Sequence, residues 1–491
     1  MARVKKAKIE TRDPAAVPLW LFVAVLAWAP LPFASNTAWA SNLLVCLIAL
    51  AAAVWAVAAI RNLDLIRVPL RRFRLLAVVA LALTLWVVVQ NAGWTPAGWH
   101  HPMWQSATDT LGVPATGAMG LDPAAAYETL ARVGAYGLTF FLAVQLARRT
   151  ETATKLAYAL AAIAVAYALY GLIVQLADLQ MVAWAEKRHY QDSVTSTFIN
   201  RNSYGTFAGL GLLVICGLLV RAMRRIATEG VTGGGLSEML DRLTFREFFL
   251  IFGFVLVLAA LILTNSRGAT LSTLFALIVF VVVTVLNQRS LRLGTIIAGA
   301  IIIVGCWLVF SVSSAGLMAR LAVFEEDAIG RREVAEIALR AIADRPFTGF
   351  GLGSFEGVFH MFRDAALNPD IPAFDKAHNT YLEWALEAGV PAAIVMVATV
   401  AALAIACARG ALIRRRNAAY PAVAAAASAL VAIHALVDFS LQIPAVTVYY
   451  AAILGLGFAQ SWSTATDEDR AASSRRQTAQ GLDAWRSAAG M

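Results

Sequence analysis

Long apolar runs separated by short polar segments are the feature that most constrains the fold of this chain. Twelve runs lie at residues 18–34, 40–60, 75–90, 127–147, 156–176, 204–220, 247–264, 269–286, 293–312, 386–407, 418–439 and 446–461. Of the 491 residues, 60% are hydrophobic and 14% are charged, whereas a soluble domain carries about 25% charged residues. A membrane-crossing helix needs about 20 apolar residues, so the pattern predicts an all-α polytopic membrane protein with about twelve transmembrane helices.

The positions of the basic residues predict the orientation in the membrane. Lys and Arg concentrate in cytoplasmic loops. If the N-terminus is cytoplasmic, the segments expected inside hold 28 of the 40 Lys and Arg residues, and the outside loops hold 11. This predicts a membrane protein with both termini in the cytoplasm. The same distribution explains the net charge of +9 without a nucleic acid partner.

Alternation of apolar and polar segments also predicts the domain organisation. Residues 1–17 form a cytoplasmic tail, 18–312 hold spans one to nine, and 313–378 form a helical periplasmic insert. Residues 379–461 hold spans ten to twelve, and 462–491 form a polar tail whose composition favours disorder.

Within the insert, residues 331–344 show the spacing of an amphipathic helix, with Val334, Ile337, Ala338, Ala341 and Ile342 on one face. Arg345-Pro346 is expected to end it. The following Gly349-x-Gly351-x-Gly353 resembles a phosphate-binding loop, but it follows no strand and has no lysine of the phosphate-binding kind. A tight turn that brings the insert's backbone close to the membrane helices is the favoured interpretation.

His378 closes the insert. Thr380 and Glu383 form a T-x-x-E capping box, which predicts a helix that begins at about Thr380. His378 then lies just outside a helix N-terminus, where backbone N–H groups attract anions. A capping or packing histidine is the alternative. Glu383 and Glu387 lie one turn apart on this helix, where they either orient His378 or an arginine or face water.

Arginines outnumber lysines on the outside face by nine to two. Arg suits bidentate binding of phosphate and carboxylate. Arg267 lies in a very short link between two spans, and Arg201 lies at the start of a span. Singly, each is equally well explained as a snorkelling or headgroup-binding arginine. Together with His378 they favour a site for a phosphate-bearing lipid.

Two intramembrane polar pairs have four-residue spacing. His434 and Asp438 are expected to share one helix face and either lock two helices together or act in catalysis. Glu128 and Arg132 are expected to form a structural salt bridge. No acidic cluster that would chelate a divalent ion is seen on the outside face, so neither a metal nor another cofactor is expected.

Several motifs resemble the O-antigen ligase and O-antigen polymerase superfamily over about residues 195–460. They are Phe198-Ile-Asn-Arg-Asn202, Asn265-Ser-Arg-Gly268, Gly330-Arg331 with Ala338-Leu339, Arg345-Pro-Phe-Thr-Gly-Phe-Gly-Leu-Gly-Ser-Phe355, His378-Asn-Thr-Tyr-Leu-Glu383 with Glu387-Ala-Gly389, and His434-Ala-Leu-Val-Asp-Phe439. Their order and spacing are more specific than any one of them. Where the family often has Asp, this chain has Thr380.

The resemblance implies a GT-C-type integral glycosyltransferase of the bacterial inner membrane with a periplasmic site. The donor is a glycan on undecaprenyl pyrophosphate. The acceptor is the lipid A-core in a ligase and a second lipid-linked glycan in a polymerase, and the ligase is favoured. His378 matches the family's histidine and is expected to act as general base in a metal-independent, inverting transfer. The expected pyrophosphate-binding and supporting residues are Arg201, Arg267, Arg331 and Arg345, with Asn202, Asn379, Glu383, His434 and Asp438 around them.

Two other classes of protein remain as alternatives. A twelve-span transporter or flippase fits the hydropathy, but the chain shows no obvious repeat between its halves. A non-catalytic scaffold of an envelope complex has no need of arginines held beside a histidine.

Overall fold

The computed structural model of this protein describes residues 14–228, 244–287, 317–363 and 374–463. Its helices are α1 (Ala16–Trp28), α2 (Ala38–Arg61), α3 (Arg74–Gln90), α4 (Met103–Leu111), α5 (Pro123–Leu146), α6 (Thr150–Leu176), α7 (Arg201–Thr228), α9 (Phe245–Leu263), α10 (Arg267–Asn287), α12 (Leu317–Asp344), α13 (Phe355–Phe362), α14 (Thr380–Ala388), α15 (Val390–Ile413), α16 (Ala419–His434) and α17 (Pro444–Ala459). Regular strands in the described part are limited to β1 (Met181–Val182) and β2 (Ala185–Glu186), which pair antiparallel.

Eight of the described helical segments are long and apolar enough to cross a membrane, and α1, α16 and α17 are shorter apolar helices. Together they overlap eleven of the twelve expected spans; the expected span 293–312 lies outside the described residues. The prediction of an all-α polytopic membrane protein is therefore confirmed. The count of twelve spans and the GT-C type stay predictions.

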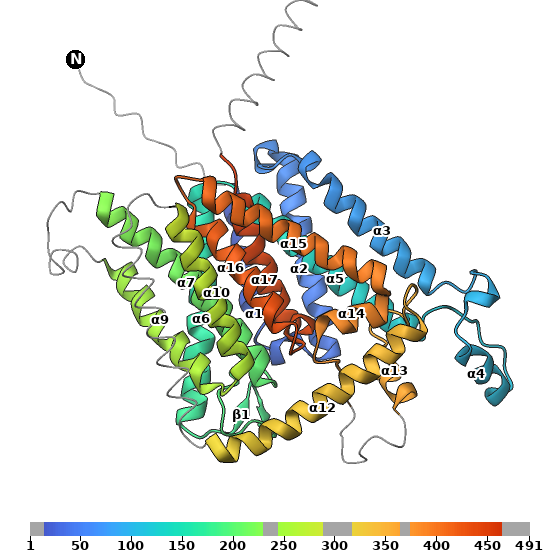
Figure 1. Ribbon diagram of the computed structural model, residues 1–491. Helices are drawn as coiled ribbons and strands as arrows, with labels where there is room; N and C mark the ends of the chain where they lie inside the picture. The colour runs from blue at the N-terminus through green and yellow to red at the C-terminus, as the bar shows by residue number, and fades with distance from the viewer. Residues whose placement is uncertain (1–13, 229–243, 288–316, 364–373, 464–491) are drawn as a thin grey trace, which may run out of the picture.

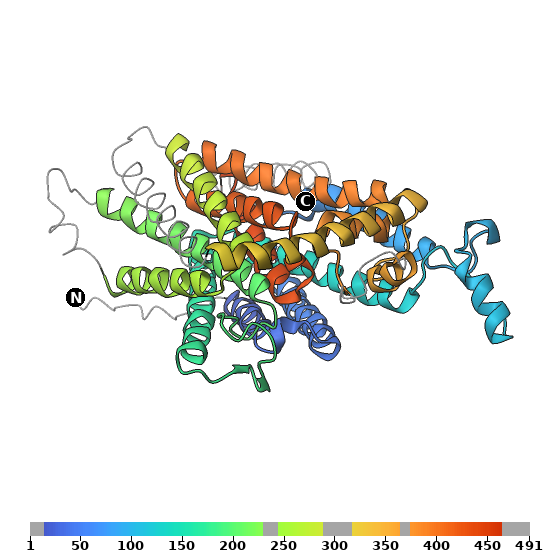
Figure 2. The ribbon, with the colours of Figure 1, turned by 60° about the horizontal axis from the view of Figure 1, so that its bottom comes forward.

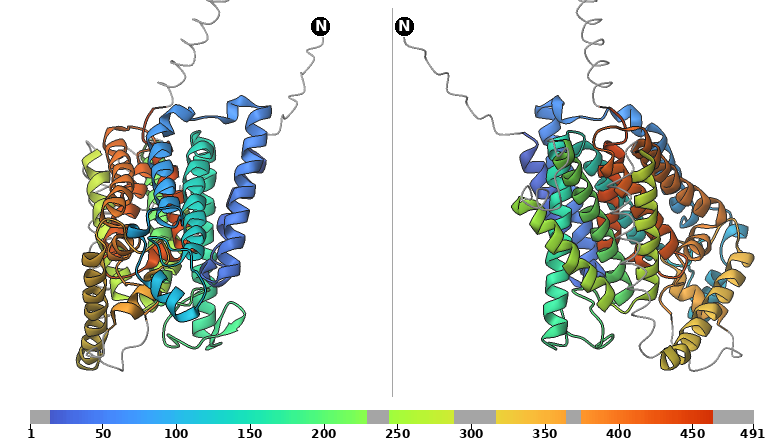
Figure 3. Two further views of the ribbon diagram at one scale, coloured as in Figure 1. Left: turned by 90° about the vertical axis from the view of Figure 1, so that its right-hand side faces the viewer. Right: turned by 60° about the vertical axis from the view of Figure 1, so that its left-hand side comes forward.

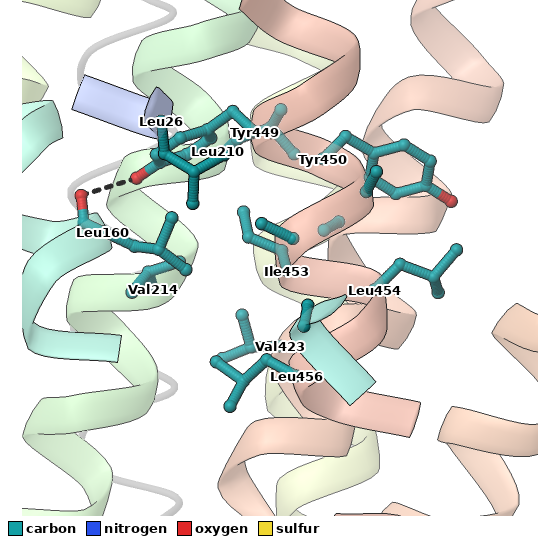
Figure 4. Packing of buried hydrophobic residues seen from close by; sticks show 14 of the residues in the cluster. Leu26, Leu160, Leu210, Val214, Val423, Tyr449, Tyr450, Ile453, Leu454 and Leu456 are labelled. Carbon is teal, nitrogen blue, oxygen red and sulfur yellow. Dashed lines mark hydrogen bonds between the residues drawn. The ribbon is translucent and has the colours of Figure 1, made fainter. Parts of the chain in front are cut away.

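Helix α17 lies at the centre of the bundle and packs against α5, α16, α15 and α7 (Figure 1). Nearly all of its residues are buried, as a helix that is apolar on every face requires. Figure 4 shows this packing from close by, with Leu210 and Val214 of α7 beside α17. The buried hydroxyl of Tyr449 donates to the backbone oxygen of Leu160 at 2.8 Å, which satisfies a polar group that would otherwise be costly inside the bundle.

Helix α12 lies across one end of the bundle, the end at the bottom of Figure 1, where the β1–β2 hairpin also lies. Figure 2 turns this end forward and shows α12 crossing in front of the bundle. The connection between α2 and α3, which contains three arginines, lies at the opposite end in Figures 1 and 3. The insert therefore covers the end of the bundle away from this basic loop.

The insert has an apolar core of its own. Its buried side chains come from α12, α13, α14 and the two segments that lead into α13 and α14: Val334, Ile337, Ala338, Ala341, Phe350, Phe355, Val358, Phe359, Ala377 and Leu386. The predicted amphipathic helix is confirmed, and Arg345-Pro346 follows its last residue, Asp344. The core ends at α14, so this helix packs as part of the insert, and the predicted span 386–407 is helical as α15 only from Val390.

The glycine segment seals the end of α14. Gly349 has φ +64°, and its backbone runs so close to α14 that an added Cβ would lie 2.4 Å from the Glu387 oxygen. The N–H groups of Phe350 and Gly351 donate to the Leu386 and Glu387 oxygens at 3.0 and 2.9 Å. Carbonyls at a helix C-terminus lack intrahelical partners, so the turn caps α14. At Gly353, an added Cβ would lie 3.0 Å from Thr129 Oγ1 of α5, so the predicted tight turn close to the membrane helices is confirmed.

Replacing Gly349 with alanine is expected to destabilise the protein by about 1–3 kcal/mol, because a non-glycine residue would be strained at this φ and the added Cβ has no space. Thermal unfolding in detergent measures the effect. The control is Gly357→Ala in α13, where an added Cβ meets nothing within 4 Å, so alanine should stabilise by about 0.5–1 kcal/mol. Equal melting temperatures for the two variants would contradict the prediction.

Candidate functional site

The starts of three helices meet at one polar segment, residues 434–442, which connects α16 to α17. At the start of α7, Asn202 Nδ2 donates to Asp438 Oδ2 at 2.7 Å. In the first turn of α10, a Cβ added to Gly268 would lie 3.4 Å from His434 Nε2. At the start of α14, the Thr380 N–H donates to the Ala435 oxygen at 2.9 Å. Because each helix N-terminus carries the positive end of a helix dipole, the convergence of the three favours an anion there.

Arg201 and Arg267 are the first residues of α7 and α10. Arg201 Nη1 donates to Ser193 Oγ at 3.4 Å, and its guanidinium lies 4.9 Å from the centre of the Tyr190 ring. Asn265, two residues before Arg267, donates to the same Ser193 hydroxyl at 3.2 Å. One serine thus ties together the two segments that carry these arginines, and the side chain of Arg267 is exposed.

His378 lies directly before the N-cap of α14. Its φ is +50°, and its ring stands edge-on to Phe374 and Phe439, with centroid distances of 5.5 and 4.8 Å. Since Phe439 belongs to the 434–442 segment, His378 and the first turn of α10 contact the same stretch of chain. The structure therefore brings His378 and Arg267 to the same end of the bundle.

The capping box predicted from Thr380 and Glu383 is wrong, although α14 does begin at Thr380. The N-cap is Asn379, whose Oδ1 accepts from the N–H groups of Tyr381 and Leu382 at 3.0 and 3.1 Å. Asn379 is as good a capping residue as Thr380 and reaches two amides. This leaves Glu383 to bind elsewhere.

Arg331 and Arg345 lie at different places on and after α12. Arg331 Nη1 donates to the Val437 oxygen at 3.4 Å, at the edge of the converging helix starts. Arg345 lies fourteen residues further along, which is about 21 Å of helix, and its Nη1 donates to the Trp99 oxygen at 3.5 Å. The structure does not bring Arg345 to the 434–442 segment.

The prediction that His434 and Asp438 share a helix face is wrong, because α16 ends at His434. The next four carbonyl oxygens each accept a donor from the insert or α14: Ala435 from Thr380 N–H, Leu436 from Asn379 Nδ2, Val437 from Arg331 Nη1 and Asp438 from Thr380 Oγ1. A continued helix would occupy these oxygens itself, so the contacts made by the insert replace it.

A buried chain of side chains connects His434 to Asp438. Ser440 Oγ lies 3.2 Å from His434 Nδ1 and donates to Asp438 Oδ1 at 3.2 Å. Thr206 of α7 also lies 3.2 Å from His434 Nδ1. His434 and Asp438 are each only 1% exposed, so this chain ties α7 to the end of α16 as the helix-locking alternative expected, through Ser440 and Thr206.

The predicted salt bridge between Glu128 and Arg132 is not formed. Arg132 instead donates to Thr129 Oγ1 at 2.7 Å. Burial raises the pKa of the Glu387 carboxyl, and the charge of Arg132 is one of several smaller effects that oppose this shift.

Sequence reasoning missed Ser193, Thr206, Ser440 and Phe374. None of them has a spacing or charge that marks it in the sequence; each gains its role from a tertiary contact. Within the described parts of the chain, no three or more His, Cys, Asp or Glu side chains are grouped so as to hold a metal ion.

A comparison with protein-family models tests the resemblance that the motifs indicate. Residues 252–397 match the family model Wzy_C, described as O-antigen ligase. This part of the chain is similar to the O-antigen ligase domain. The resemblance that the motifs predicted is confirmed, and the match supports an O-antigen ligase- or polymerase-like function of the glycosyltransferase kind on lipid-linked glycans, in a membrane. A search of curated proteins found no match to this chain.

The matched region includes Arg267, Arg331 and His378 but not Arg201 or the 434–442 segment. Asn202 and Asp438 join these two outer parts to each other, and Phe439 contacts His378 of the matched region. The site thus draws on chain both before and after the matched residues.

Replacing Asp438 with alanine is expected to destabilise the protein by about 1–3 kcal/mol, because the Asn202 amide and the Ser440 hydroxyl lose a buried acceptor. Thermal unfolding in detergent is the measurement. Asp109→Ala is the control, since Asp109 is an exposed residue of α4, and its loss should change stability by no more than about 0.5 kcal/mol. An unchanged melting temperature for Asp438→Ala would refute the role given to this carboxylate.

Proposed function

We propose that this protein is an O-antigen ligase-like glycosyltransferase of the bacterial inner membrane. It moves a glycan from undecaprenyl pyrophosphate to the lipid A-core on the periplasmic side, without a metal ion. The observation that carries the proposal is the meeting of the α7, α10 and α14 N-termini at residues 434–442, with Arg201, Arg267 and His378 at their starts.

The arginines have the chemistry to hold the donor's pyrophosphate. Arg201 and Arg267 place guanidinium groups at the positive dipole ends of α7 and α10, and Arg331 adds a third guanidinium at the edge. When the anomeric C–O bond breaks, the electron pair stays on the pyrophosphate oxygen. Pre-positioned donors around that oxygen stabilise the charge as it develops and need no cation to do so.

His378 has the chemistry of a general base. The acceptor hydroxyl attacks the anomeric carbon from the face opposite the pyrophosphate, forms the new C–O bond and inverts the configuration. Its proton passes to the imidazole and from there to water. Histidine exchanges protons readily near neutral pH, and the two aromatic edges that border the His378 ring limit its rotation.

The test is glycan transfer by purified protein in detergent, with lipid-linked glycan as donor and lipid A-core as acceptor. Appearance of the glycan on lipid A-core supports the ligase. Transfer onto a second lipid-linked glycan alone indicates the polymerase. A glycan that never changes its carrier, in a detergent solution where no gradient exists, refutes both and favours a transporter.

A further inference from the structure

The buried face of α14 carries two carboxyl groups with different partners. Glu383 and Glu387 are 3% and 5% exposed and lie one helical turn apart. Glu383 Oε2 accepts from the Ala377 N–H at 2.9 Å, whereas Glu387 Oε1 accepts from the Phe355 N–H at 3.3 Å. Burying a carboxyl group is costly unless it is hydrogen-bonded. The backbone group that each carboxyl binds therefore indicates which segment it holds in place.

Glu383 binds the backbone of the residue directly before His378. Ala377, which precedes the histidine, is 2% exposed and belongs to the insert's core. His378 itself has a φ of +50°, a conformation that costs a non-glycine residue about 1–3 kcal/mol and persists only where the surroundings impose it. Glu383 fixes the chain before the imidazole, and Asn379 fixes the chain after it by capping α14.

The Glu387 contact ends elsewhere. Phe355 is the first residue of α13, and the glycine segment lies just before it. This carboxyl holds the start of α13 and has no hydrogen bond to residues 374–379. The two carboxyl groups are thus matched in burial and helix position but differ in the segment that each one holds.

We propose that Glu383 is a positioning residue for His378, acting through the Ala377 amide, and that Glu387 serves the start of α13 alone. The positional part stands on the geometry of the insert, and its effect on turnover rests on the proposed function. A shift of about 1 Å in a reacting group costs about 10²-fold in rate, so a loosened Ala377 has a measurable consequence.

The charge state of Glu383 identifies its best substitute. Burial, with a smaller effect of the Glu387 charge, raises the pKa of Glu383 to about 8, although Lys376 opposes the shift. At pH 7 the group is therefore mostly a neutral acid, and its carbonyl oxygen accepts the hydrogen bond from the Ala377 N–H. Glutamine keeps that acceptor without a charge, and leucine removes it at similar size.

Hydrogen exchange tests the positional part without any need for activity. Amide exchange of the peptide that contains Ala377 should be at least about tenfold faster in Glu383→Leu than in the wild type. It should stay close to wild type in Glu383→Gln and in Glu387→Leu, the matched control, while Glu387→Leu loosens the peptide that contains Phe355. Unchanged Ala377 exchange in Glu383→Leu overturns the proposal. If the leucine variant does not fold, Glu383→Asp withdraws the carboxyl by one methylene and replaces it in the experiment.

Steady-state transfer tests the consequence for turnover. Glu383→Leu should lower kcat about 10²-fold with the donor KM within about twofold, and glutamine should restore most of the lost kcat. Equal losses for Glu383→Leu and Glu387→Leu, with no rescue by glutamine, would show a structural role alone and refute the proposal. If the wild type transfers no glycan, the proposed function fails, and the exchange data still decide whether Glu383 positions His378.

Discussion

Replacing His378 with alanine is expected to lower kcat for glycan transfer by about 10²–10⁴-fold, the range of a general base, with the donor KM changed little. The imidazole would take the proton of the attacking hydroxyl. Initial rates with saturating donor and acceptor measure the effect. His378→Gln should be as slow as the alanine variant, because an amide can hydrogen-bond but cannot accept the proton.

The matched control is His360→Ala. His360 is an exposed residue of α13 in the same insert, so its loss should leave kcat within about twofold. A wild-type rate for His378→Ala would remove the general base from the mechanism. A fall in melting temperature equal for His378→Ala and His378→Gln, with unchanged kcat in the folded fraction, would assign His378 to packing, the alternative that the sequence left open.

Replacing Arg267 with alanine is expected to lower kcat by about 10²–10³-fold, as the loss of one donor to a developing anion does. Arg267 is the first residue of α10 and is tied to the neighbouring loop through Asn265, so its guanidinium lies at a fixed helix start. Lysine keeps the charge but not the planar pair of donors, and Arg267→Lys should remain at least about tenfold slower than the wild type. Transfer assays and binding of undecaprenyl pyrophosphate measure the two contributions.

Arg332→Ala is the matched control for charge. The Arg332 side chain is 81% exposed and pairs with Glu336 at 2.9 Å on the outer face of α12, so removing it changes the net charge equally without touching the site. If both variants lose the same small fraction of activity, the effect of Arg267 is the general field of a basic surface. Donor binding that is unaffected by Arg267→Ala would contradict the pyrophosphate contact.

Much of the fold was predictable from the sequence, because a run of about twenty apolar residues in a bilayer has one solution, a helix. The amphipathic helix of the insert was equally clear from the spacing of Val334, Ile337 and Ala341. The glycine turn was recognised because its sequence lacked both the strand and the lysine of a phosphate loop. These features depend on local pattern alone.

The features that the sequence predicted wrongly depend on contacts from distant parts of the chain. The spacing of His434 and Asp438 predicts a continued helix, but donors from α14 and Arg331 take the carbonyls that the helix needs. Thr380 carries a valid capping signature, but the preceding Asn379 reaches two amides first. Arg345 has the same residue type and expected side of the membrane as the other arginines. It lies at the far end of α12 from Arg331, where its guanidinium donates to the Trp99 oxygen.

The apolar core of the insert has a consequence for work with fragments. This core includes Leu386 of α14, which lies eight residues beyond residue 378, the predicted end of the polar insert. A soluble fragment cut at residue 378 would lack Leu386 and expose the faces of Val334 and Phe359 to water, and such a surface favours aggregation. A fragment that extends through Ala388 would keep Leu386 in the core, and it is the better choice for crystallising the insert apart from the membrane helices.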